Sequence, residues 1–168
     1  KTNFSYSTGM LFAYALIKAI NQIKGYNYIN LIPATLIGNY YARDHQNAHV
    51  LTAMLRKFSL NKKKIDLYGD GSPRREFLHI DDLFDSILFL RKKKIRIEIL
   101  NVGTNKDYTI KQLAQKLTKK FNFNGKIFWD KTKPNGVKRK LLNSSFIKKL
   151  GWTPKKDTID LILKTINV

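Results

Sequence analysis

Apolar residues recur at helical spacing over several stretches of this chain. Within residues 6–24, Leu11 and Ala15 lie four positions apart, Ile20 and Ile23 lie three apart, and Gly25 follows as a typical helix stop. The same spacing predicts further helices over residues 49–60, 81–91, 109–117, 144–150 and 157–166. Thr109 and Gln112 have the spacing of a capping box at the start of one of these helices.

Short apolar runs between these helices predict strands, over residues 28–32, 65–68, 98–102 and 126–129. Residues 34–46 read as a polar and aromatic loop after Pro33, and the glycine-rich stretch that ends in Arg74 and Arg75 reads as an exposed loop. Because strands separated by helices of ten or more residues are typical of crossover units, the pattern predicts an α/β fold with a parallel sheet.

The composition indicates a globular chain. Its 168 residues, 43% of them apolar, are enough for one well-filled core and a small second lobe. We find neither an apolar run of about 18 residues nor a secretory signal pattern, so we expect no membrane association. The absence of cysteine excludes disulfides and thiolate metal sites, and the three histidines have no clustered carboxylates with which to form a zinc site. A cytoplasmic location is the default expectation.

The formal net charge of +20 raises the question of a polyanionic partner. Lysines outnumber arginines 25 to 7, and Lys, Asn and Ile are abundant together, which indicates a general bias spread over solvated faces. We therefore favour solvated lysines together with a small phosphate-bearing ligand, and we do not expect specific nucleic-acid binding, which stays the least favoured alternative.

Two stretches are unusual for a scaffold, YGDGSPRREFLHIDD at 68–82 and KPNGVKRKLL at 133–142. Glycines let the backbone approach a ligand closely, and the guanidinium groups of Arg74 and Arg75 match phosphate oxygens in a two-pronged geometry. The pattern predicts a site for an anionic ligand.

Four blocks in series resemble one family. In chain order they are HVLTAMLRKF, YGDGSPRREFLHIDDL, LNVGTNKDYTIKQLAQKL and KPNGVKRKLL, the last followed by LGWTP. They are similar to the carboxy-terminal half of the GDP-L-fucose synthases, enzymes of the extended short-chain dehydrogenase/reductase superfamily. The resemblance covers residues 6 to about 166 almost without gaps.

The resemblance implies the carboxy-terminal part of a Rossmann-type parallel sheet with a smaller α/β substrate-binding lobe. Residues 1–48 would be the remnant of the NADP-binding domain and 49–168 mainly the substrate lobe, with segments near 76–104 packing back on the Rossmann domain. The family's cofactor loop and catalytic serine would precede Lys1, so we interpret the sequence as a fragment that is inactive in isolation.

The implied reaction converts GDP-4-keto-6-deoxy-D-mannose to GDP-L-fucose by 3,5-epimerisation and reduction of the 4-keto group with NADPH. The family works as a homodimer that pairs the helix of its catalytic tyrosine with a neighbouring helix. A second hypothesis is a non-catalytic nucleotide-sugar binder of the same superfamily.

Tyr6 aligns with the family's catalytic tyrosine, which donates a proton to the oxygen at carbon 4 of the sugar. A phenol with an ordinary pKa of about 10 is a poor acid-base group at neutral pH unless a cation stabilises its anion. The family places a lysine one helical turn later, where this chain has Met10. We therefore expect slow or absent reduction if no other group replaces that lysine.

His49 aligns with the family's general acid for epimerisation, a role that suits a group titrating near neutrality. His79, just before two aspartates, is interpreted as structural. The positions that match the family's cofactor contacts are Met10, Pro33, Ala34, Thr35, Leu36 and His49. Thr35 replaces the asparagine that is usual there.

Five positions match the family's substrate contacts or lie beside them: Lys57, Tyr68, Arg75, Lys126 and Lys140. The cations would neutralise a diphosphate, and an aromatic ring would pack on the ligand. Asn135 stands where the family's loop has an aspartate, which removes one charge from that loop.

Overall fold

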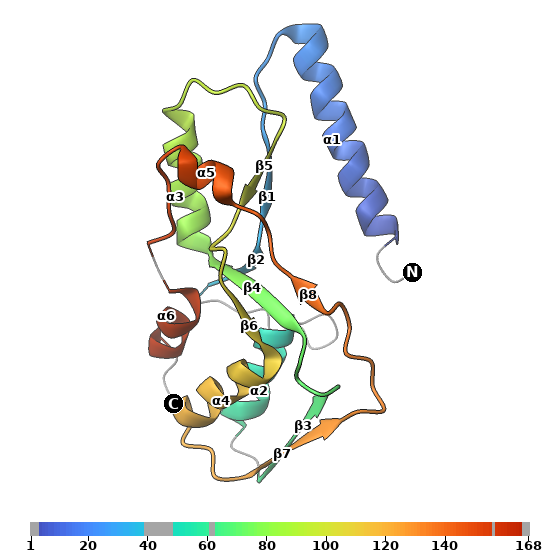
Figure 1. Ribbon diagram of the computed structural model, residues 1–168, viewed down its shortest axis with the longest axis vertical. Coiled ribbons are helices and arrows are strands. Elements are labelled where there is room, and N and C mark those ends of the chain that lie inside the picture. Colours follow the sequence, from blue (N-terminus) through green and yellow to red (C-terminus); the bar gives the residue numbers. More distant parts are fainter. Residues whose placement is uncertain (1–3, 39–48, 61–62, 156, 166–168) are drawn as a thin grey trace.

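The computed structural model describes residues 4–38, 49–60, 63–155 and 157–165 (Figure 1). Its helices are α1 (Phe4–Lys24), α2 (Val50–Ser59), α3 (Ile80–Arg91), α4 (Ile110–Lys120), α5 (Ser145–Lys149) and α6 (Thr158–Thr165). Its strands are β1 (Asn30–Pro33), β2 (Thr35–Ile37), β3 (Lys64–Tyr68), β4 (Arg74–His79), β5 (Ile99–Val102), β6 (Asp107–Thr109), β7 (Lys126–Asp130) and β8 (Arg139–Lys140).

Among the described residues, the strands pair in three groups. β1 pairs with β5 and β3 pairs with β7, both in parallel. β4 pairs in parallel with β2 and with β8, but antiparallel with β6. The α/β class and the parallel pairing are confirmed, and the antiparallel β6 is an addition that the crossover pattern does not predict.

Strand β4 joins two apolar cores. Phe77 packs into a lower core with α2, α4 and β3, whereas the next residue, Leu78, packs into an upper core with β1, β5, α3 and α5 (Figure 1). Successive side chains of a strand point to opposite faces, so one strand serves both cores. Strand β4 therefore lies at the junction between the two cores.

Two predicted loops are partly strands. Thr35–Ile37 forms β2, with Ile37 buried, although the sequence reading assigned 34–46 to a loop; residues 39–46 lie outside the described part. Arg74 and Arg75 open β4 and are half-buried, not exposed loop residues. Their pairing depends on residues far along the chain, since the Arg74 amide donates to the Lys138 carbonyl at 2.9 Å, and local pattern cannot reveal such a partner.

The helix caps are formed by residues that lie close together in the sequence. Thr109 and Gln112 form the predicted capping box, with hydrogen bonds of 3.0 and 2.8 Å. Helix α3 begins at Ile80, one residue before the predicted start, because the His79 side chain accepts from the Asp81 amide and serves as the N-cap.

Helix α1 stands to one side of the rest of the molecule and contains no buried residue (Figure 1). Glu98 contacts the middle of α1: it accepts a hydrogen bond from the Tyr14 hydroxyl at 2.6 Å and forms an ion pair with Lys18 at 3.1 Å. Within the described ranges, no helix combines the length and apolar character that crossing a membrane requires.

Candidate active site

A cleft of about 740 Å³ lies between α1 and the sheet. Tyr6 and Met10 line it from α1, Pro33, Ala34 and Thr35 from the β1–β2 junction, and Lys140 from β8. These residues come from three distant stretches of the sequence. The structure thus brings together the predicted catalytic tyrosine, most of the predicted cofactor contacts and one predicted substrate contact.

Tyr6 and Met10 share the cleft-facing side of α1, one helical turn apart. The Tyr6 side chain has ample access to a ligand, since the residue is 69% exposed. Met10 offers a thioether and no charge, so it cannot stabilise a phenolate. Lys140 is a cation that lines the same cleft.

Arg75 and Lys140 occupy paired positions on β4 and β8. One guanidinium nitrogen of Arg75 donates to the Arg74 and Val137 carbonyls, both at 2.7 Å, which fixes the plane of the group. Partial burial lowers the pKa of Arg75 from its usual value. Two neighbouring strands therefore each carry a cation at the same level, and of these two cations Lys140 lines the cleft.

Lys57 and Tyr68 form a second group at the end of β3. The Lys57 Nζ donates to the Asp66 carbonyl at 2.5 Å and lies 5.3 Å from the centre of the exposed Tyr68 ring. Lys126 pairs with Lys64 at the opposite end of the β3–β7 ladder. Four residues of strand separate the levels of Lys126 and Tyr68, about 13 Å, so the structure does not bring these two together.

The two glycine-containing loops touch each other. The Asn135 side-chain oxygen accepts from the Asp70 amide at 2.8 Å, and a Cβ on Gly69 would lie 2.0 Å from that oxygen. Gly69 has a φ of +75°, which other residues rarely adopt. Although Asn135 lacks the expected charge, it joins the loop after β3 to the loop before β8.

Three further predicted residues, His49, Leu36 and His79, do not line the cleft. His49 is exposed at the N-cap position of α2, directly after the undescribed residues 39–48. Leu36 packs against the upper core, whereas its neighbour Thr35 lines the cleft. His79 is buried and caps α3, consistent with a structural role. Over the described residues, no group of three potential metal ligands is found.

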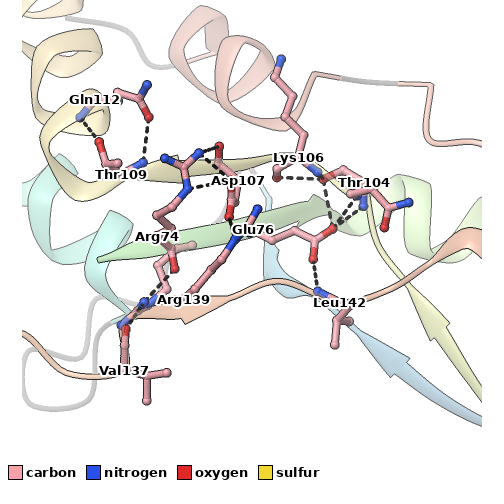
Figure 2. A network of polar contacts seen from close by, with 12 residues as sticks. Arg74, Glu76, Thr104, Lys106, Asp107, Thr109, Gln112, Val137, Arg139 and Leu142 are labelled. Atoms are coloured by element: carbon pink, nitrogen blue, oxygen red, sulfur yellow. Dashed lines mark hydrogen bonds and ion pairs between the residues drawn. The ribbon is translucent and has the colours of Figure 1, made fainter. Parts of the chain in front are cut away.

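Two buried carboxylates around β4 were not identified from the sequence. Asp107 accepts from Arg74 at 2.7 and 3.0 Å and from Arg139 at 2.6 Å, and Glu76 accepts four hydrogen bonds (Figure 2). The hydrogen bonds from Arg74 and then from Arg139 lower the pKa of Asp107 despite its burial. The sequence REFLH places the acidic Glu76 among apolar strand residues, and this pattern could have indicated a buried, hydrogen-bonded carboxylate.

The α/β fold, with parallel strand pairs and a tyrosine-bearing helix beside a cleft, resembles that of Rossmann-type epimerases and reductases. The chain belongs to the NAD dependent epimerase/dehydratase family, whose model matches residues 1–103. It is 37% identical over 158 residues to "Probable GDP-L-fucose synthase 1" of Oryza sativa subsp. japonica, covering 92% of this chain and 48% of the relative.

Two further likenesses agree with this assignment. "GDP-L-fucose synthase 1" of Arabidopsis thaliana is 36% identical over 168 residues, 98% of this chain and 52% of the relative. Among solved structures, MlghC, a GDP-mannoheptose C4 reductase from Campylobacter jejuni with NADP bound, has a TM-score of 0.79 and 27% identity, over 97% of this chain and 57% of its own. The chain thus spans about half the length of the curated relatives it matches.

Proposed function

We propose that this chain is the substrate-binding part of an NADP-dependent GDP-L-fucose synthase. The observation that carries the proposal is the common cleft of Tyr6 and Lys140, with Arg75 paired beside Lys140. The similarity to proteins named GDP-L-fucose synthase supports the choice of substrate, GDP-4-keto-6-deoxy-D-mannose.

The substrate diphosphate would lie between Arg75 and Lys140, whose charges and hydrogen-bond donors match its oxygens. Tyr68 and Lys57 would contact the nucleoside end, since Lys57 lies over an exposed ring that is available for stacking. We expect Lys126 to contribute least because it lies at the far end of the strand pair.

Tyr6 would donate a proton to the oxygen at carbon 4, and His49 would exchange a proton with the sugar during epimerisation. The β1–β2 junction, Pro33 to Leu36, would hold the nicotinamide end of NADP, and Met10 would pack beside it. The largely apolar wall of a 740 Å³ cleft suits a flat heteroaromatic ring. When bound, NADPH supplies the hydride that reduces the 4-keto group.

Met10 favours a second candidate, a nucleotide-sugar binder of the same family without reductase activity. A methionine beside Tyr6 removes the cation that would support proton donation. If Met10 limits reduction, a Met10→Lys variant of the complete protein should turn over faster than the wild type. Equal rates for the two proteins would contradict this view.

Calorimetry tests the ligand class. We expect GDP-fucose to bind the chain more tightly than GDP-mannose or an oligonucleotide, with a weak dependence on salt. Arg75→Ala should weaken GDP-fucose binding at least tenfold, whereas Lys93→Ala, a matched removal of a charge beyond α3, should leave it unchanged. Tighter binding of the oligonucleotide, with a steep loss of affinity at higher salt, would support nucleic-acid binding instead.

Three wider expectations accompany the proposal. Residues 1–48 would belong to the cofactor domain and 49–168 mainly to the substrate lobe, with 76–104 packing back on the cofactor domain. Exposed apolar residues on α1, among them Phe4, Leu11 and Phe12, would be covered in a homodimer of the complete protein. The cysteine-free sequence keeps a cytoplasmic location as the expectation.

A further inference from the structure

Glu76 is a buried carboxylate at the junction of the two cores, only 1% exposed. Its Oε1 atom accepts from the amides of Thr104 and Asn105 at 2.6 and 2.8 Å and from the Thr104 hydroxyl at 3.2 Å. Its Oε2 atom accepts from the Leu142 amide at 2.8 Å (Figure 2). One side chain therefore ties three separate segments together, the strand β4, the turn after β5 and the segment after β8.

The turn that Glu76 holds has an unusual shape. Asn105 has a φ of +57°, a left-handed conformation that few residues other than glycine adopt. A Cβ on Gly103 would lie 2.5 Å from Oε1, so the carboxylate reaches the turn only because glycine stands there. The Asn105 side chain in turn accepts from the Ser144 amide at 2.9 Å, which extends the connection past Leu142.

The same carboxylate lies next to the strand pair that carries the two proposed phosphate-binding cations. Arg75 precedes it on β4, and Lys140 lies two residues before Leu142. Strand β8 has only two residues, so its own ladder holds Lys140 weakly. Glu76 also borders the cleft that Tyr6 and Lys140 line.

We propose that Glu76 is a positioning residue, which fixes the segment bearing Lys140 against β4 so that Lys140 and Arg75 face one diphosphate. This role rests on the proposed function of the cleft. Glu76 itself does not contact the ligand, and it acts through its bond to the Leu142 amide.

The chemistry of the site makes Glu76→Gln a selective test. All the partners of the carboxylate donate hydrogen bonds, and an amide has only one acceptor oxygen. That oxygen will face the three donors of Thr104 and Asn105, which turns the amide NH₂ towards the Leu142 N–H. The substitution should therefore break the connection to β8 and preserve the connection to the turn.

Hydrogen exchange and calorimetry with GDP on the 168-residue chain measure the two parts of the role. In Glu76→Gln we expect the Leu142 amide to exchange at least tenfold faster, while the Thr104 and Asn105 amides change little. GDP affinity should fall about tenfold, the effect of one lost charge-assisted hydrogen bond. The control Thr104→Val, which removes one bond to Oε1 and leaves Oε2 intact, should keep the GDP affinity within about twofold.

A double-mutant cycle separates positioning from general support of the fold. If Glu76 acts through Lys140, adding Glu76→Gln to Lys140→Ala should not reduce GDP affinity further. Additive losses, an unchanged Leu142 exchange rate, or an unchanged GDP affinity in the single variant would each overturn the proposal.

A second variant covers the case in which Glu76→Gln does not fold. Glu76→Asp, whose side chain is one methylene too short to span both groups of partners, then replaces it with the same outcomes. If the wild-type chain binds no GDP, the proposed function fails, and the exchange of Leu142 alone decides whether Glu76 holds β8.

Discussion

Replacing Asp107 with alanine should destabilise the fold around the candidate site. The Asp107 side chain is 5% exposed and joins β6 to Arg74 on β4 and to Arg139 on β8. Asp107→Ala removes three charge-assisted hydrogen bonds at once. Both arginines lose their buried partner, and the three-strand junction loses its central acceptor.

The magnitude follows from the exposure of the partners. Hydrogen bonds to charged groups contribute about 1.5–3 kcal/mol each when buried. Arg74 and Arg139 are 37% and 56% exposed, so water can solvate them after the substitution. We therefore expect a total loss of about 2–3 kcal/mol in the free energy of unfolding. With a urea dependence of about 2 kcal/mol per molar, the unfolding midpoint should fall by about 1–1.5 M.

Urea unfolding at two pH values is the assay. The pKa of Asp107 is lower in the folded state than in the unfolded chain, where an aspartate has a pKa of about 3.9. Its contribution is thus present above pH 4 and is lost as the pH falls through the folded-state pKa. The difference between wild type and Asp107→Ala should be full at pH 7 and smaller at pH 3.

A surface ion pair provides the control. Lys64 and Asp66 lie 3.1 Å apart with more than half of each side chain exposed. Asp66→Ala should change the unfolding free energy by less than about 0.5 kcal/mol. If Asp107→Ala shifted the midpoint no more than Asp66→Ala, or if its effect did not decrease at low pH, the central role of the Asp107 carboxylate would be refuted.

Three further substitutions should act through single contacts, each measured as a urea midpoint. Gly71→Ala should cost at least about 2 kcal/mol, because φ is +78° and the new Cβ would lie 2.6 Å from the Trp129 ring; a neutral effect would contradict that geometry. Trp152→Phe should cost about 1–2 kcal/mol by removing the 2.9 Å bond from Nε1 to Asp85, and an unchanged urea midpoint would contradict that contribution. Thr109→Ala should cost about 1 kcal/mol through the lost cap of α4, and Thr109→Ser should restore most of it.

Much of the fold was predictable because its signals are local. The capping box at Thr109 needs only four residues, and the strands 65–68 and 126–129 show their apolar character directly in the sequence. Strands β6 and β8 were not predictable in this way. They have three and two residues, and they are strands only because β4 lies beside them.

The candidate site was likewise predictable only in part: several of its residues could be identified from the sequence, but their arrangement could not. Tyr6, Met10 and Lys140 were identified individually by family resemblance, and their common cleft depends on the packing of α1 near β8, which sequence spacing does not encode. Lys126 matched the family pattern as well as Lys57 did, yet the register of β3 and β7 separates it from Tyr68. Glu76 and Asp107 were missed because their partners are arginines and amides 28 to 66 residues away along the chain.

The most direct test of the account is NADPH oxidation by the complete protein with GDP-4-keto-6-deoxy-D-mannose. We predict oxidation that requires the sugar nucleotide and that Tyr6→Phe slows at least about a hundredfold, since proton donation by a positioned side chain contributes that much. Oxidation at the wild-type rate by Tyr6→Phe would contradict the assignment of the cleft as the active site. So would oxidation by the wild type that did not require the sugar nucleotide.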